Sequence, residues 1–283
     1  MLQGKSKEHA PTGLPDQSHI VSRGFPEKVP ACIVLEKISH CFGDKQVLCD
    51  IDLTVPHGII YGLLGPSGCG KTTTVKIMAG ILEASSGSIK VLGETMPKLT
   101  LMNRIGYMAQ SDALYSNLTA EENLAFFSGL YGMEKKKTRE RISEVLALVN
   151  LAGDRTKVVA AYSGGMKRRL SLAMALLHEP IVLILDEPTV GIDPLLRNSI
   201  WDTLNKIAEH GVTIIVTTHV MDEAEKCREL AMLREGRLIA RGTPSQLREN
   251  IGASSLEEAF IHYGKGGSGQ PDGQFHRGGR HED

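Results

Sequence analysis

The chain has 283 residues, of which 41% are hydrophobic and 23% are charged. This ordinary globular mixture excludes a wholly disordered chain, and the length suits one large domain or two small ones. The formal net charge of −1, from 32 Lys and Arg against 33 Asp and Glu residues, excludes a dedicated nucleic-acid coat.

The lengths of the apolar runs and the pattern of cysteines indicate in which cellular compartment the chain is expected. No apolar run approaches the roughly 20 residues that a helix needs to cross a bilayer, and the first residues lack the apolar core of a signal peptide. We therefore expect a cytosolic chain without direct membrane insertion. The sequence predicts neither a disulfide framework nor a zinc site, because its cysteines are odd in number and form no CxxC pair: Cys32, Cys41, Cys49, Cys69 and Cys227.

Both ends of the sequence differ in composition from its middle. Residues 1–30 are rich in Pro, Gly, Ser and charged residues, which predicts a flexible leader. Residues 264–283 are rich in Gly, which predicts a disordered tail. The ordered domain is therefore expected over residues 31–263.

The middle alternates between strand and helix patterns. In chain order these predict strands at 32–40, 47–55 and 58–64, a helix at 72–82, strands at 87–92 and 104–109, a helix opening at the capping box Thr119-Ala-Glu-Glu122, helices at 138–148 and 166–177, a strand at 181–185, a helix at 198–209 and a strand at 212–217. The last two strands are unbroken apolar runs, as in a parallel sheet covered on both faces. This order predicts an α/β core with inserted subdomains.

A glycine-rich segment follows the strand predicted at 58–64 and matches G-x-x-x-x-G-K-[ST]. Its glycines let several backbone N–H groups point at one anion, and the next helix presents its positive end to the same anion. Lys71 supplies a charge for the terminal phosphates, Thr72 a hydroxyl for Mg²⁺ and Thr73 a further phosphate donor. The predicted phosphate site comprises Gly65, Pro66, Ser67, Gly68, Cys69, Gly70, Lys71, Thr72 and Thr73.

Polar residues also end two of the apolar strands. Asp186 and Glu187 follow the strand at 181–185, at the sheet edge where ligands bind. We expect Asp186 to hold Mg²⁺ and Glu187 to polarise a water for attack on the γ-phosphate. His219 ends the strand at 212–217, and spacing alone leaves open whether it is functional or structural.

A set of motifs in fixed order resembles the ATP-binding cassette (ABC) family, the ATPase subunits of ABC transporters, over about residues 32–263. The set comprises the phosphate loop, Gln110, Tyr162-Ser-Gly-Gly-Met-Lys-Arg-Arg169, Asp186-Glu187, Gly191-Ile-Asp-Pro194 and His219. The resemblance implies an α/β P-loop NTPase (RecA-like) core with a mostly parallel sheet. It also implies an N-terminal antiparallel β subdomain and an inserted α-helical subdomain over about 111–178.

The resemblance assigns roles to single residues. It implies that Phe42 stacks on adenine, that Gln110 reaches Mg²⁺ and water, and that Asp193 helps to join two copies of the subunit. It identifies Glu187 as the catalytic base and His219 as the switch histidine.

The Ser-Gly-Gly signature is predicted to form a second anion site. Ser163, Gly164 and Gly165 precede a helix, whose N-terminus favours negative charge. In the family this motif caps the γ-phosphate that the other subunit's phosphate loop holds. The basic run Lys167–Arg169 is predicted to be mostly a solvated helix face.

The resemblance also implies ligands and partners. These are ATP and Mg²⁺, a separately encoded transmembrane permease and a second copy of the chain in a homodimer, at the cytoplasmic face of the membrane and without nucleic acid. Tyr162 in place of Leu and Met166 in place of Gln resemble the branch of drug-resistance exporters and A-type lipid transporters.

Other functions are weighed against an exporter subunit. An importer subunit and a non-transport cassette ATPase acting on DNA or ribosomes remain alternatives. A P-loop kinase or GTPase fits poorly, because the signature is foreign to both and Asn205-Lys206 is not followed by the Asp of a guanine site.

Overall fold

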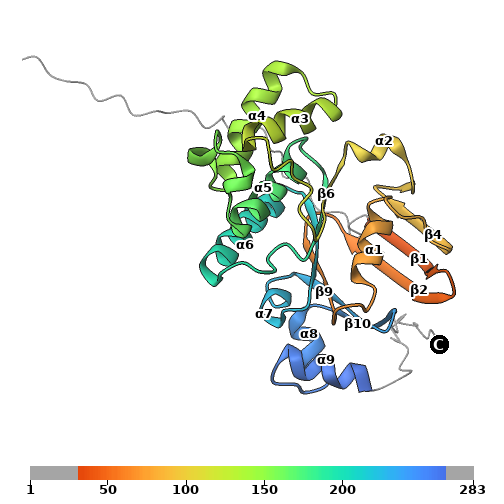
Figure 1. Ribbon diagram of the computed structural model, residues 1–283. Helices are drawn as coiled ribbons and strands as arrows, with labels where there is room; N and C mark the ends of the chain where they lie inside the picture. Colours follow the sequence, from red (N-terminus) through yellow and green to blue (C-terminus); the bar gives the residue numbers. More distant parts are fainter. Residues whose placement is uncertain (1–30, 266–283) are drawn as a thin grey trace, which may run out of the picture.

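The computed structural model describes residues 31–265, which form two β-sheets and the helices around them (Figure 1). The strands are β1 (Ala31–Phe42), β2 (Lys45–Pro56), β3 (Ile60–Leu64), β4 (Ser86–Val91), β5 (Glu94–Thr95), β6 (Ile105–Met108), β7 (Val182–Asp186), β8 (Thr213–Thr218), β9 (Glu229–Arg234) and β10 (Arg237–Gly242). The helices are α1 (Lys71–Met78), α2 (Leu99–Met102), α3 (Ala120–Leu130), α4 (Lys135–Leu148), α5 (Gly164–Leu176), α6 (Pro194–Glu209), α7 (Met221–Ala224), α8 (Pro244–Glu249) and α9 (Leu256–Lys265), with 3₁₀ turns η1 (Ala152–Asp154) and η2 (Val159–Ala161).

The larger sheet has the order β10-β9-β3-β8-β7-β6. Its strands are parallel except β10, which is antiparallel to β9. Strands β3, β7 and β8 are buried at every position, which explains their unbroken apolar runs. Because these strands are parallel, the phosphate loop after β3, the acids at the end of β7 and His219 after β8 all reach the same edge of the sheet.

Two hydrophobic cores cover the two faces of this sheet. Alternate residues of one strand enter different cores: Leu183 and Leu185 of β7 pack into one, and Val182 and Ile184 into the other. The first core contains residues of α3 to α6. The second contains residues of α1 and of the smaller sheet.

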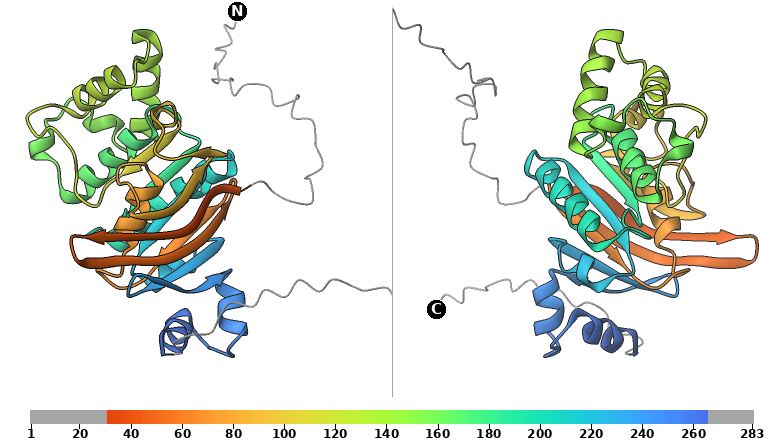
Figure 2. Two further views of the ribbon diagram at one scale, coloured as in Figure 1. Left: turned by 90° about the vertical axis from the view of Figure 1, so that its right-hand side faces the viewer. Right: turned by 60° about the vertical axis from the view of Figure 1, so that its left-hand side comes forward.

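The smaller sheet is antiparallel, with the order β2-β1-β4-β5. Figure 2 shows it as a separate layer beside the larger sheet. The predicted fold class is thereby confirmed: a mostly parallel α/β core carries an N-terminal antiparallel sheet and, between β6 and β7, a group of helices. Helices α3 and α4 lie at one end of the molecule and α8 and α9 at the other (Figure 1).

Local sequence signals explain where two helices begin or end. Thr119 and Glu122 form the predicted capping box, in which the Thr119 hydroxyl accepts the Glu122 N–H at 3.2 Å and the Glu122 carboxylate accepts the Thr119 N–H at 2.8 Å. Helix α1 ends at Met78, earlier than predicted. Gly80 takes a φ of +70°, and such a left-handed glycine just past the last turn ends many helices.

Several predictions concern the ends of the chain or its relation to membranes. The predicted leader lies outside the described residues, as does the predicted tail beyond Lys265, where α9 ends. Strands β9 and β10 and helices α7 to α9 have no counterpart among the predicted elements. Within residues 31–265 no helix has the length and apolar character needed to span a bilayer.

Candidate functional site

The phosphate loop lies between the carboxyl end of β3 and the start of α1. Gly70, just before the helix, has a φ of +109°, a backbone conformation that residues other than glycine rarely adopt. A Cβ atom at Gly70 would also lie 2.6 Å from Leu48 Cδ2. The positive φ therefore requires glycine here, and the close approach of Leu48 leaves little room for a side chain.

Lys71 is the first residue of α1 and is almost completely buried. Its ammonium group donates hydrogen bonds to the carbonyl oxygens of Gly65 at 2.7 Å and Pro66 at 3.0 Å. Its Nζ atom also lies 3.5 Å from Glu187 Oε1. The two loop carbonyls thus fix the ammonium group of Lys71 close to the carboxylate of Glu187.

Asp186 ends β7 and is fully buried. Its Oδ1 atom accepts hydrogen bonds from the hydroxyls of Thr217 at 2.6 Å and Thr72 at 3.2 Å. Its Oδ2 atom is buried and has no hydrogen-bond partner within the part of the chain that the structure describes. A buried carboxylate oxygen without a donor, beside a threonine hydroxyl, fits the oxygen ligation that Mg²⁺ prefers.

Three side chains converge on the carboxylate of Glu187. Gln110, which follows β6, donates from Nε2 to Oε2 at 3.2 Å, and Lys71 lies near Oε1. His219, which follows β8, places Nδ1 3.2 Å from Oε1. Four residues that the sequence predicts to be catalytic therefore meet at one point on the sheet edge.

The backbone of Glu187 is also unusual. Its φ is +48°, in the left-handed region where a residue other than glycine is strained. Its N–H donates to the hydroxyl of Thr217 at 2.8 Å. The conformation aims an almost buried carboxylate at the loop.

Part of the phosphate loop, Gln110 and Glu187 share one cavity of about 260 Å³, which Asp186 and His219 do not line. It is lined by Val47, Ser67, Gly68, Gly70, Lys71, Thr72, Thr73, Gln110 and Glu187. The loop that is predicted to bind phosphate and the carboxylate that is predicted to activate water therefore face the same space.

Cys69, within the loop, is buried. Burial raises the pKa of its thiol, an effect that the nearby Lys71 only partly offsets. At neutral pH the thiol therefore stays protonated and is a poor nucleophile, which agrees with a packing role.

The other predicted site residues do not line this cavity. The hydroxyl of Ser163 accepts the N–H of Met166 at 3.2 Å and caps α5, where Ser163 and Gly164 are exposed. The carboxylate of Asp193 accepts the N–H of Leu196 at 3.0 Å and caps α6. The two caps are neighbours, because a Cβ at Gly165 would lie 2.7 Å from Leu196 Cδ2.

Phe42 lies at the end of β1, with 54% of its surface exposed. Its ring is packed edge-on against His40, with ring centroids 4.6 Å apart. Phe42 is therefore free to receive a flat ring from outside, but no described contact joins it to the cavity.

Two buried charged residues at this edge were missed from the sequence. The prediction that Arg168 lies on a solvated helix face is wrong. Arg168 is buried and donates to backbone carbonyls on both sides of the site. Glu223 accepts hydrogen bonds from the hydroxyls of Thr189 and Thr218, the latter at 2.7 Å. Nothing in the exposed-looking Met-Asp-Glu-Ala segment indicates this contact. Arg168, in contrast, precedes a nearly all-apolar helical run, where a charge needs partners.

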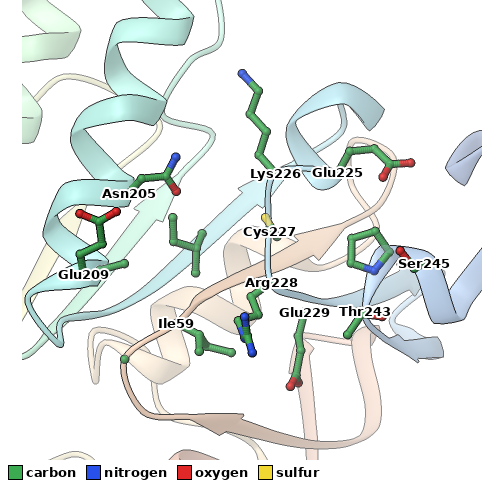
Figure 3. A pocket seen from close by; sticks show the side chains of 14 residues that line it. Ile59, Asn205, Glu209, Glu225, Lys226, Cys227, Arg228, Glu229, Thr243 and Ser245 are labelled. Carbon is green, nitrogen blue, oxygen red and sulfur yellow. The ribbon is translucent and has the colours of Figure 1, made fainter.

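A larger hollow, of about 830 Å³, opens at the opposite edge of the sheet, where β3 and β9 begin (Figure 3). Its wall mixes both signs of charge, with Glu209 and Glu229 beside Lys226 and Arg228. None of the predicted site residues lines it. The chemistry predicted from the sequence therefore belongs to the smaller cavity.

Comparisons with known proteins give the family and the relatives that the chain resembles. The profile of the family described as "ABC transporter" matches residues 48–190. The Probable multidrug ABC transporter ATP-binding protein YbhF of Escherichia coli is 42% identical over 244 residues, which cover 83% of this chain and 42% of that protein. The chain thus spans less than half of that relative.

Two further proteins cover the chain to a similar extent. The Nod factor export ATP-binding protein I of Paraburkholderia xenovorans is 40% identical over 231 residues, which cover 80% of this chain and 76% of that protein. A solved structure of an ATP binding subunit of an ABC transporter has a TM-score of 0.75 and 29% identity, and covers 82% of this chain and 99% of that one.

Proposed function

The chain belongs to the ABC transporter family, and we propose that it is the ATP-binding and ATP-hydrolysing subunit of an exporter whose transmembrane permease is a separate chain. The observation that carries the proposal is the meeting of Lys71, Gln110 and His219 at the carboxylate of Glu187, beside the phosphate loop. Such a constellation suits attack of water on a bound terminal phosphate.

Binding of ATP begins at the loop. The backbone N–H groups of the loop and the N-terminus of α1 favour an anion at this place. Lys71, which donates to two loop carbonyls, gains a charged acceptor when a phosphate arrives. Phe42 receives the adenine ring on its exposed face. Thr72, Gln110 and Asp186 would hold Mg²⁺, which supplies charge to the phosphates when bound.

Hydrolysis uses the carboxylate of Glu187 as a general base. The carboxylate of Glu187 lines the same cavity as the phosphate loop, so it can take a proton from a water held there beside a terminal phosphate. Gln110 and His219, each 3.2 Å from one carboxylate oxygen, fix its orientation. His219 is 41% exposed, so it can also reach a terminal phosphate outside the protein surface.

Closure requires a second copy. The signature residues Ser163, Gly164 and Gly165 face solvent or a neighbouring helix rather than the cavity of their own chain. In a head-to-tail homodimer they would cap the γ-phosphate held by the other copy, and Asp193 beside them would join the same interface. ATP would then bind the two copies together, and its hydrolysis would release them.

Contact with the permease is assigned to an exposed apolar patch formed by Tyr115, Phe126 and Leu130, which have 48%, 44% and 68% of their surfaces exposed. The rings of Tyr115 and Phe126 are 4.9 Å apart. Exposed apolar clusters of this kind mark interaction sites. The patch adjoins the segment that begins at Gln110, so a permease bound here could act on the catalytic carboxylate. Export, rather than import, is supported by the names of the multidrug and Nod factor relatives.

The proposal is tested by purifying a tagged chain from membranes. A multi-spanning protein should be recovered with the wild-type chain and with the variant Ile261→Asp, which changes an exposed apolar residue of α9 at the far end of the molecule. Phe126→Asp should lose at least about 10-fold of the recovered permease, because it places a charge in the apolar patch, and should still bind ATP. Recovery with ribosomes or nucleic acid instead of a membrane protein would contradict the proposal.

A further inference from the structure

Arg168 has an arrangement that no other described arginine shows. It lies on α5, one turn after the signature, and is 6% exposed. A guanidinium group has five N–H donors, and here each meets a backbone carbonyl. The acceptors are Pro188 O for Nε at 3.1 Å, Ala109 O and Gln110 O for Nη1 at 2.8 and 2.9 Å, and Asp186 O and Glu187 O for Nη2, both at 2.7 Å.

These carbonyls belong to two segments that carry catalytic side chains. One follows β6 and includes Gln110, and the other ends β7 and includes Glu187. The strands β6 and β7 pair as far as Met108 and Leu185. Beyond that pair the guanidinium of Arg168 joins the backbones of the two segments, in addition to the side-chain hydrogen bond between Gln110 and Glu187. It therefore sets the spacing of the two backbones where the site begins.

The backbone of Glu187 needs such a link. Its left-handed φ persists only if surrounding groups hold it. The hydroxyl of Thr217 holds its N–H, and Arg168 holds its carbonyl together with those of the residues before and after it. Without Arg168, one side of this strained residue would lose its support.

The same helix also holds the segment after Gln110. Asp112 accepts a hydrogen bond from Ser171 at 2.9 Å and lies 3.6 Å from Arg168. Ser171 is one turn beyond Arg168 on α5, and α5 packs against β6 (Figure 1). A shift of α5 would therefore move both segments.

We propose that Arg168 is a positioning residue that aligns Gln110 with Glu187 and makes this alignment depend on the position of α5. Because α5 begins at the signature, engagement of the signature by ATP on another copy would adjust the catalytic base within the same chain. This inference rests on the proposed ATPase function. It assigns to Arg168 no contact with ATP.

The inference is tested with the full-length chain by measuring kcat and KM for ATP in Arg168→Lys. Lysine keeps the charge but offers three donors from one atom, so it cannot hold all five carbonyls of the two segments. We expect kcat to fall about 100-fold, as for a misplacement of about 1 Å, while KM changes by less than about threefold. In the Glu187→Gln background the same change should lower residual turnover by less than about twofold, because Arg168 acts through Glu187.

The matched control is Arg169→Lys. Arg169 is the next residue of α5 and also donates to backbone carbonyls, those of Val149 at 3.1 Å and Asn150 at 2.8 Å, away from the cavity. The kcat of the Arg169→Lys variant should stay within about twofold of the wild-type value. Equal losses in the two variants, an unchanged kcat in Arg168→Lys, or a full additional loss in the Glu187→Gln background would overturn the inference. A wild-type chain that does not hydrolyse ATP would instead refute the proposed function.

Discussion

Glu187→Gln is expected to lower ATP turnover by about 10²–10⁴-fold, the range typical of general-base catalysis. The amide keeps the size of the carboxylate but cannot take the proton of the attacking water. ATP binding should be retained or strengthened, because the change removes a negative charge 3.5 Å from Lys71 Nζ. Steady-state hydrolysis and equilibrium binding of ATP, measured on the same preparation, separate the two effects.

The control for this variant is Glu209→Gln. Glu209 is exposed at the end of α6 and lines the hollow at the opposite edge of the sheet. The Glu209→Gln variant should hydrolyse ATP at the wild-type rate. Wild-type turnover in Glu187→Gln would remove Glu187 from the role of general base.

Lys71→Ala is expected to weaken ATP binding by about 10–100-fold, since hydrogen bonds to charged groups contribute about 1.5–3 kcal/mol. The variant removes the buried ammonium group that faces the cavity and leaves the carbonyls of Gly65 and Pro66 without their donor. Titration with a fluorescent ATP analogue measures the change in Kd.

The control here is Lys76→Ala, one turn and a half along the same helix. Lys76 does not line the cavity, so its removal should change Kd by less than about twofold. An unchanged Kd in Lys71→Ala would mean that the loop binds phosphate without this charge, or that the nucleotide lies elsewhere.

Much of the site could be predicted from the sequence because its parts are local. The phosphate loop is one continuous segment, and parallel strands deliver Glu187 and His219 to the same edge of the sheet. The strand pattern alone left open whether His219 is functional, and the pairing of β7 with β8 is what brings it to Glu187.

The supports of the site could not be predicted in the same way. The hydroxyl of Thr217 donates to the carboxylate of Asp186 and accepts the backbone N–H of Glu187. Glu223 joins Thr189, which follows β7, to Thr218 at the end of β8. Each contact depends on how distant segments pack. Arg168 was assigned to solvent because two basic residues flank it. The buried helix that follows it was the better guide.

The missing elements have a related cause. Strand β9 has a short apolar run between charged residues, Glu229 and Arg234, and is buried because β3 lies beside it. In isolation this pattern fits a strand or a turn of helix equally well. Its place in the sheet was decided by the neighbouring strand.

The central claim is that ATP joins two copies of the chain through their phosphate loops and signatures. Sedimentation velocity of the Glu187→Gln chain tests it most directly, because bound ATP is then not consumed. We predict a dimer in saturating MgATP and a monomer in MgADP. A monomer in both nucleotides, under conditions where ATP binding is confirmed, would contradict the account.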